Sequence, residues 1–242
     1  MTTERSDIEV SGIPVEIRRK AIKNLHVGVY PPDGKVRVAA PPHLDDEAVR
    51  LAIVSRLSWI RRQRQGFARQ VRQSPREMVT GESHYLEGRR YRLNVVEHPG
   101  NPKVSVANNT TLELRVPPGL ERDKRQGVLE RWYRRRLKAQ IPELLAHWEP
   151  IVGVEVSDCR VKRMKTRWGS CNIQARRVWL NLELVKKDPA CLEYILVHEM
   201  VHMLERHHTD RFRALMDQFM PDWRVRRDHL NQSPLAHEDW DY

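Results

Sequence analysis

The amino-acid sequence predicts an α+β protein, and three features of the chain lead to this class. Short alternating or apolar segments, separated by Pro, Gly, Asn and Asp, are typical of β-strands and occur throughout the first 120 residues. Two long segments with apolar residues at helical spacing carry clusters of Arg. Near the C-terminus, Cys191–Leu204 has apolar residues on nearly all sides of a predicted helix, which indicates that this helix is buried in a core.

The first strands are predicted at Leu25–Tyr30 and Val36–Ala40, where apolar residues flank a Pro-Pro-Asp-Gly turn. A long helix is expected from His43 to Arg72. It opens with acidic residues, which favour a helix N-terminus, and continues with apolar residues at helical spacing toward a basic end.

Further strand segments follow as two hairpin patterns, each closed by a short polar turn: Ser83–Leu86 with Arg90–Val95, and Lys103–Val106 with Thr111–Val116. A second long helix is expected from about Arg122 to His147, after a Pro-Pro-Gly turn. Pro142 should kink or break this helix, because proline cannot donate the backbone hydrogen bond that a helix interior needs.

The C-terminal part is expected to contain a strand around Val154–Val161, a second strand at Val178–Leu182 and then the buried helix. These elements suggest a β-rich N-terminal region with one long helix at 1–120, a core at 121–232 and a loose tail at 233–242. No internal repeat is evident in the sequence.

The composition is that of a globular protein, with 242 residues, 40% of them hydrophobic. No apolar run approaches the roughly 18 residues of a membrane span, and the N-terminus lacks the basic-then-apolar pattern of a signal peptide. We therefore expect a cytoplasmic protein with no membrane partner. The three cysteines indicate neither a disulfide framework nor a cysteine-based zinc site, because they lack close spacing: Cys159, Cys171 and Cys191.

The segment from His198 to His202 (His-Glu-Met-Val-His) predicts a catalytic zinc site. Two histidines four residues apart project from one face of a helix, one turn apart, so both can reach a single metal ion. Glu199 lies beside the first histidine but off its face, where it can act as general base on metal-activated water, as in zinc peptidases. The alternative is a pair of core histidines with ordinary hydrogen bonds and a solvated Glu199.

A catalytic zinc normally has three protein ligands, so a third ligand is needed. In an unbroken helix His208 would point nearly opposite to His202, and the chain must therefore turn near Arg206. Because histidine tolerates positive φ, we interpret His207 as the turn residue and His208 as the third ligand. His207 as the ligand is the competing assignment.

These residues resemble the YgjP-like metallopeptidase family, whose pattern is HExxH followed by a third His. A second block, Lys-Thr-Arg-Trp-Gly-Ser-Cys at 165–171, matches that family's Arg-Trp-Gly-Ser-Cys signature. The resemblance covers roughly Ile17 to Leu230 and implies His198, His202 and His208 as zinc ligands, with Glu199 as catalytic base. The chain departs from the family at three positions. It has His207 where the family commonly has Asn, Thr209 where it has Ser, and Arg213 where it has Trp.

The resemblance also implies a zincin-like core with a small mixed sheet around the HExxH helix, preceded by the β-rich part with its long basic helices. In such proteins the last strand before the active-site helix lies beside the cleft and can pair with an extended peptide. The spacing to the third histidine is shared with SprT-like and WLM proteases, which act on DNA-bound proteins. Metzincins share it too, but place Gly where this chain has Glu205, and no Met-turn is identifiable.

Four side chains near these motifs have two interpretations each. Arg167 and Trp168 either border the metal site or form an exposed Arg beside a packed Trp. Cys171 is a nucleophile or, as we favour, a small apolar filler. Trp179 lines the cleft or packs in the core, which we also favour.

The net charge of +11 is clustered on the two long helices, which fits non-specific contact with nucleic acid as well as an ordinary solvated face. Three hypotheses follow. The first is a zinc-dependent metallopeptidase that cleaves peptide bonds of protein or peptide substrates. The second is a DNA-associated protein that docks through its basic helices and acts on proteins held there. The third is a non-catalytic zinc module, in which the metal has four protein ligands.

Overall fold

The computed structural model describes residues 5–30, 34–69, 76–164 and 167–232, which form two compact units with separate hydrophobic cores. The first unit contains the described residues from 5 to 69, and the second contains those from 76 to 232. The division between the units therefore lies at a different place from the regional boundary expected at residue 120. The tail expected at 233–242 and the Pro31-Pro32-Asp33 turn lie outside the described residues.

The first unit contains a four-stranded sheet in the order β1-β2-β4-β3. Its strands are β1 (Arg5–Val10), β2 (Ile13–Arg19), β3 (His26–Tyr30) and β4 (Lys35–Ala40). The predicted hairpin of β3 and β4 is confirmed, with Val29 opposite Val36. The pattern did not predict β1 and β2, nor the parallel pairing of β2 with β4.

The single long helix expected from His43 to Arg72 is wrong. Two helices are present, α1 (Asp46–Val54) and α2 (Leu57–Arg69), and the chain turns between them at Ser55 and Arg56. Asp45 caps α1 by accepting a hydrogen bond from the Ala48 N–H at 2.7 Å. At the other end of α1, the Ser55 hydroxyl donates to the Ala52 carbonyl at 2.9 Å, a local bond that competes with helix continuation.

The second unit begins with a sheet in the order β5-β6-β8-β7. Its strands are β5 (Ser83–Leu86), β6 (Arg89–Glu97), β7 (Lys103–Asn108) and β8 (Thr111–Val116). Both predicted hairpins are confirmed, and β6 and β8 join them by parallel pairing.

The two four-stranded sheets have the same arrangement of strands. The sequence showed no internal repeat, and that expectation is wrong. Strand order and pairing directions agree, and each outer hairpin turns through two residues with positive φ, Ser11-Gly12 and Glu87-Gly88. The last strand of each copy leads into Pro-Pro-x-Leu and a helix. The same interval separates Gly12 from Gly88 as separates Pro41 from Pro117.

The two copies differ in the register of their parallel strands. Val15 lies opposite Val36 in the first copy, whereas Leu93, two residues beyond the counterpart of Val15, lies opposite Leu112 in the second. A shift by two residues keeps the same side chains on the same face, so both copies preserve an apolar face. The copies share few identical residues, which is why the repeat was not visible in the sequence.

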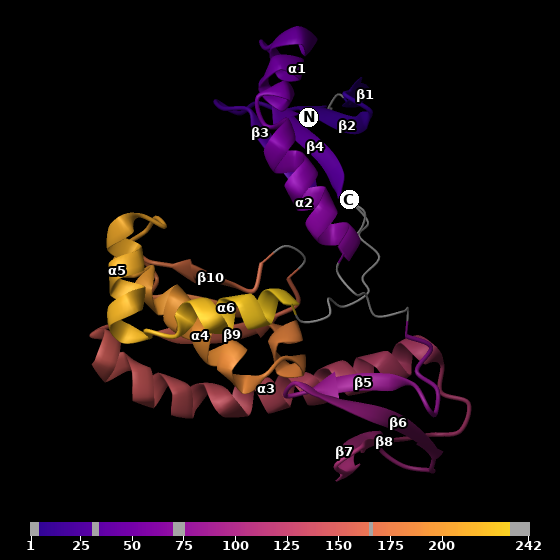
Figure 1. Ribbon diagram of the computed structural model, residues 1–242. Helices are drawn as coiled ribbons and strands as arrows, with labels where there is room; N and C mark the ends of the chain where they lie inside the picture. The colour runs from indigo at the N-terminus through magenta and orange to yellow at the C-terminus, as the bar shows by residue number, and fades with distance from the viewer. Residues whose placement is uncertain (1–4, 31–33, 70–75, 165–166, 233–242) are drawn as a thin grey trace. The chain divides into compact units, whose positions relative to one another are not determined.

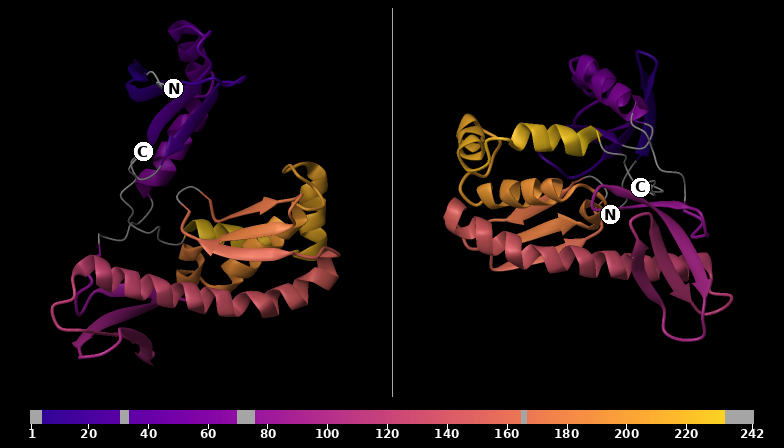
Figure 2. Two further views of the ribbon diagram at one scale, coloured as in Figure 1. Left: turned by 180° about the vertical axis from the view of Figure 1, so that it is seen from behind. Right: turned by 60° about the horizontal axis from the view of Figure 1, so that its bottom comes forward.

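Helix α3 (Arg122–Val152) connects the sheet of the second unit to the rest of that unit, as Figures 1 and 2 show. Its N-terminal part packs on β7 and β8, and other parts contact β9, η1 and α4. Of the kink or break expected at Pro142, the break does not occur, since the helix is continuous through this residue. The helix continues to Gly153, whose φ of 74° ends it in the left-handed conformation.

The remaining elements form the part of the second unit that holds the histidines. A three-stranded sheet has the order β10-β11-β9, with β9 (Asp158–Lys162), β10 (Gly169–Asn172) and β11 (Arg177–Asn181). After the short helix η1 (Leu182–Lys186) come α4 (Pro189–Val201), α5 (Asp210–Phe219) and α6 (Trp223–Gln232). The α+β class is thereby confirmed. None of the helices, as far as the structure describes them, is long and apolar enough to span a membrane.

Candidate active site

Helix α4 places the first two histidines. Asp188 begins the helix by accepting a hydrogen bond from the Ala190 N–H at 2.9 Å, and Pro189 occupies the first turn, where its missing N–H costs nothing. Most of the helix is buried, because apolar residues lie on nearly all of its sides. His198 and His202 lie one turn apart and are half-buried, with ring centroids 4.9 Å apart.

The chain turns after His202, as predicted, and brings the third histidine back. Helix α4 ends at Val201, and α5 begins after Thr209, whose hydroxyl accepts the Phe212 N–H at 3.3 Å. The expected positive φ at His207 is wrong, since His207 is not among the positive-φ residues. Three successive backbone turns after Val201, including the Glu205 N–H donating to the Val201 carbonyl at 2.9 Å, reverse the chain instead.

The imidazoles of His198, His202 and His208 converge at one place, with their ligand atoms all within 4.8 Å of one another. The Nε2 atoms of His198 and His208 lie 3.0 Å apart. Two nitrogens on one tetrahedral zinc are separated by roughly 3.3 Å, so this spacing fits a shared metal ion. His207 is not part of this cluster.

The surroundings of the cluster also fit a metal site. The His202 Nδ1 lies 3.2 Å from the Glu205 carbonyl, so its other nitrogen, Nε2, is free to bind a cation. Phe212 packs beneath all three rings, at 4.7–5.0 Å between centroids. Burial, together with His202 and His208, lowers the pKa of His198 to about 3, which keeps its imidazole neutral and able to donate a lone pair.

Glu199 lies beside the cluster and is buried, with 6% of its surface exposed. Burial raises its pKa to about 8, and the charge of Arg167 opposes this shift. Its carboxylate packs against the backbone of β10, because a Cβ atom added to Gly169 would lie 2.5 Å from Oε1 of Glu199. Only glycine at position 169 leaves room for this side chain.

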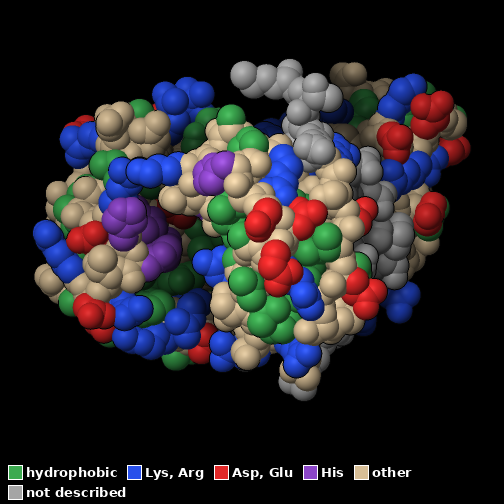
Figure 3. Space-filling model, turned by 90° about the horizontal axis from the view of Figure 1, so that it is seen from above, with side chains coloured by type: hydrophobic (Ala, Val, Ile, Leu, Met, Phe, Trp, Pro, Cys, Tyr) green, Lys and Arg blue, Asp and Glu red, His purple; other side chains and the backbone are tan. Residues whose placement is uncertain are grey.

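The cluster opens into a pocket of about 670 Å³. Its walls come from the segment around β10, from α4 and the turn after it, and from α6. Figure 3 shows His side chains beside a hollow that Lys and Arg side chains border. Glu199 and the three histidines all line this pocket, so a substrate in it can reach both the carboxylate and the imidazoles.

A family model described as YgjP-like, metallopeptidase domain, matches residues 24–233. The chain belongs to the YgjP-like metallopeptidase family. Membership implies a peptidase with protein or peptide substrates and a metal ion, for which the three histidines are a suitable ligand set. The predicted family is thus confirmed.

Other comparisons add less. A search of curated proteins finds no match. Among solved structures, the chain is similar to one titled as the metallopeptidase zymogen of Pyrococcus abyssi abylysin, with 19% sequence identity and a TM-score of 0.35. The similarity covers 37% of this chain and 90% of that one.

In this YgjP-like metallopeptidase, the side chains with two interpretations can now be placed. Arg167 and Trp168 line the pocket, whereas Trp179 is not among its lining residues. Instead, Lys162 of β9 lies over the Trp179 ring, with Nζ 4.6 Å from the centroid. Burial and the charge of Glu199 raise the pKa of Cys171 to about 11, so its thiol stays protonated and is a poor nucleophile.

Asn181 is a buried residue that the sequence interpretation missed. Its amide group donates to the carbonyls of Met164 and Arg167, both at 2.8 Å, and its backbone N–H donates to the Trp168 carbonyl at 2.8 Å. Its side-chain oxygen accepts from the Glu183 N–H at 3.2 Å. These bonds hold Arg167 and Trp168, which lead into Gly169. An Asn at the end of an apolar strand is the only signal in the sequence, and such residues usually mark ordinary turns.

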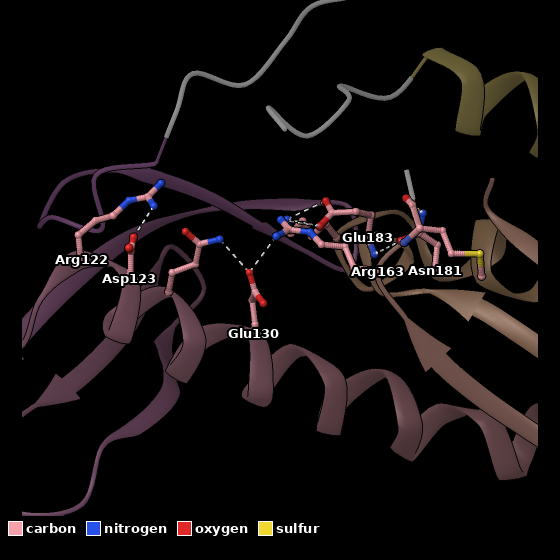
Figure 4. A network of polar contacts seen from close by, with 9 residues as sticks. Arg122, Asp123, Glu130, Arg163, Asn181 and Glu183 are labelled. Atoms are coloured by element: carbon pink, nitrogen blue, oxygen red, sulfur yellow. Dashed lines mark hydrogen bonds and ion pairs between the residues drawn. The ribbon is translucent and has the colours of Figure 1, made fainter. Parts of the chain in front are cut away.

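A charged network joins this segment to α3 (Figure 4). Arg163 bridges Glu130 of α3, at 3.0 Å, and Glu183 of η1, at 3.8 Å. Burial would raise the pKa of Glu183, but the charges of Lys186 and Arg163 hold it below its usual value. Since a buried carboxylate without partners would be destabilising, these cations tie η1 to its neighbours.

We expect Gly169→Ala to reduce peptidase activity more than metal binding. The added methyl group would displace the Glu199 carboxylate but not the three imidazoles. Zinc content and peptide hydrolysis measured on the same preparation test this. Gly127→Ala in α3, where an added Cβ would meet no atom closer than 3.5 Å, is the matched control. Full activity of Gly169→Ala would contradict the assigned position of Glu199.

The raised pKa of Glu199 predicts a pH-dependent stability of the metal-free protein. The folded protein keeps a proton that the unfolded chain releases above the ordinary pKa, so the stabilisation is present below about pH 4.5 and is lost as the pH rises toward about 8. Glu199→Gln removes this titration. The free energy of unfolding of the unaltered protein should therefore fall relative to that of Glu199→Gln across this range in denaturant titrations. If the free energies of unfolding of the two proteins changed in parallel with pH, the raised pKa of Glu199 would be contradicted.

Proposed function

We propose that this metallopeptidase is zinc-dependent, with His198, His202 and His208 as zinc ligands and Glu199 as general base. The observation that carries the proposal is the meeting of three imidazoles and one buried carboxylate at a single pocket. Nitrogen ligands in this number are typical of catalytic zinc. The core around them is proposed to be zincin-like, because the HExxH helix and its turn are the defining parts of such a site.

A bound zinc ion would lower the pKa of water and polarise the scissile carbonyl. Glu199 then accepts the proton of the attacking water and returns it to the nitrogen of the leaving amine. A carboxylate whose burial favours its protonated form suits the second transfer, and a nearby cation favours its ionised form for the first. Its packing against Gly169 fixes where both transfers occur.

The substrate is proposed to pair with β10. The expectation that the last strand before the active-site helix receives the peptide is wrong, because β11 is the central strand and already pairs with β10 and β9. Strand β10 is at the edge of this sheet, and Gly169, Ser170 and Cys171 line the pocket. Addition of an extended peptide to this edge uses backbone hydrogen bonds and therefore reads little sequence.

A purely structural zinc module is disfavoured. Structural zinc has four protein ligands, whereas among the described residues no fourth His, Cys, Asp or Glu joins the cluster of three. An open position beside the pocket supports a catalytic role instead.

Two substitutions test the proposed mechanism. Glu199→Gln should lower peptide hydrolysis by roughly 10²–10⁴-fold, the usual contribution of a general base, while zinc content stays unchanged. His208→Ala should lower zinc content, and His207→Ala is its matched control because that side chain is outside the cluster. Metal analysis and cleavage of a fluorogenic peptide library provide the measurements. Undiminished cleavage by Glu199→Gln would reject the mechanism, and zinc loss in His207→Ala would reject the ligand set.

A second proposed function is docking on nucleic acid, and one observation supports it for the first unit. Helix α2 contains no Asp or Glu, and Arg61 and Arg62 are exposed and form no ion pair within the described residues. Trp59 on the same helix is 37% exposed, which suits base stacking. On α3, by contrast, Arg134 binds the Val161 carbonyl and Arg136 binds Glu87.

If α2 docks on nucleic acid, single-stranded DNA should bind with a steep salt dependence. The double substitution Arg61→Gln/Arg62→Gln should weaken binding and lower the slope of log affinity against log salt by about 2, since each lost phosphate contact lowers it by about 1. Arg115→Gln/Arg160→Gln removes the same charge elsewhere and should change the slope less. Fluorescence anisotropy at several salt concentrations measures this. No binding at low salt would exclude the docking function.

A further inference from the structure

The pocket beside the histidines is lined by arginines from three different elements. Arg167 precedes β10, Arg206 lies in the turn after α4, and Arg227 belongs to α6. Among the described residues that line the pocket, Glu199 is the only acidic one. Cationic side chains therefore outnumber the single carboxylate, and Lys and Arg are visible at the border of the hollow in Figure 3. Such a pocket attracts negatively charged ligands.

Two of these arginines have charge available for a ligand. Arg167 and Arg206 are exposed, and no acidic side chain in the described ranges forms an ion pair with them. Arg227 differs, because it pairs with Asp228 at 2.8 Å and its guanidinium lies over the Trp223 ring, 5.1 Å from the centroid. Among the described arginines of the pocket lining, Arg167 and Arg206 are thus the two without an acidic partner, and they come from different segments.

Arg167 lies close to Glu199 along the pocket. It lines the same pocket and precedes by two residues Gly169, against which the Glu199 carboxylate packs. Arg206 lies in the turn after α4, four residues after His202 and two before His208. Both arginines therefore line the pocket next to residues of the proposed site.

A carboxylate is the peptide group that this arrangement fits. Guanidinium groups bind carboxylates through paired, charge-assisted hydrogen bonds, and the pocket of about 670 Å³ has room for a few residues of an extended peptide. Since β10 begins at Gly169, a peptide that pairs with its edge passes Arg167 at one end of the strand. The carboxylate would then lie next to the scissile bond.

We propose that Arg167 and Arg206 determine substrate specificity, and that the pocket selects peptides by a carboxylate close to the cleaved bond. The carboxylate comes from an Asp or Glu side chain or from the free C-terminus of the peptide. This inference rests on the proposed function of the site as a peptidase.

Binding is measured separately from cleavage, with the zinc-loaded Glu199→Gln protein and four N-acetylated peptides. The peptides share one sequence with a central Glu or Gln, and each has a free or an amidated C-terminus. Fluorescence anisotropy of a labelled peptide gives the affinity. Peptides with the selected carboxylate should bind at least about tenfold more tightly than the neutral peptide, the usual scale for a charge-assisted pair. A difference between the Glu and Gln peptides shows that the side-chain carboxylate is recognised, and a difference between the free and amidated peptides shows that the C-terminal carboxylate is recognised.

Substitutions assign the effect to the two arginines. Arg167→Gln or Arg206→Gln, placed in the Glu199→Gln protein, should reduce the preference roughly tenfold and leave binding of the neutral peptide nearly unchanged. Arg206→Lys keeps the charge and should retain part of the preference. Arg135→Gln, an exposed arginine on α3, is the matched control and should retain all of it. Zinc content shows that each variant is folded at the site.

The outcomes separate this inference from the proposed function. Equal affinity for all four peptides, or a preference that survives both arginine substitutions, would overturn the specificity proposal even if the unaltered protein cleaves peptides. Selective binding of carboxylate peptides that are never cleaved would support the pocket's specificity and reject the peptidase mechanism. A preference of the unaltered protein for the same peptides in kcat/KM would support both.

Discussion

The structure of the second unit depends on one constraint in α4: the helix is buried on nearly every side and yet carries the polar side chains of His198 and Glu199. Burying an imidazole or a carboxylate without partners is costly, so the surrounding elements must either satisfy these groups or leave them facing the pocket. Here Phe212 supports the imidazoles from below, and Gly169 makes space for Glu199. The shifted pKa values of His198 and Glu199 are the direct result of this burial.

The wall that contains β10 is held both by its pairing with β11 and by side-chain hydrogen bonds. Asn181, at the end of β11, binds the carbonyls of Met164 and Arg167 and so fixes the segment that leads to Gly169. Because Gly169 has no side chain, the backbone of β10 can approach the carboxylate of Glu199 closely, and Asn181 holds the residues before Gly169 in place. The Arg163 network then connects this wall to α3, so the long helix supports both sides of the pocket (Figure 4).

Local patterns were sufficient to predict the histidines and most strands, because helical spacing and alternation are properties of short segments. They did not predict the parallel pairs β2 with β4 and β6 with β8, which join residues far apart in the chain. The position of β10 as an edge strand and the role of Asn181 were missed for the same reason. The turn at His207 was misjudged because backbone hydrogen bonds after Val201 reverse the chain without a positive φ.

The repeated arrangement of four strands and a helix serves different purposes in the two units. In the second unit the helix that follows Pro-Pro-x-Leu extends over 31 residues and reaches the catalytic elements. Acidic partners there engage its arginines and those near it, as Glu87 does with Arg136. In the first unit the corresponding helix is interrupted at Ser55, and α2 beyond it has no acidic residue. Within the described residues, Arg61 and Arg62 of α2 therefore have no ion pair that could stabilise their helix, whereas ion pairs such as those of Glu130 and Arg136 tie α3 to its surroundings.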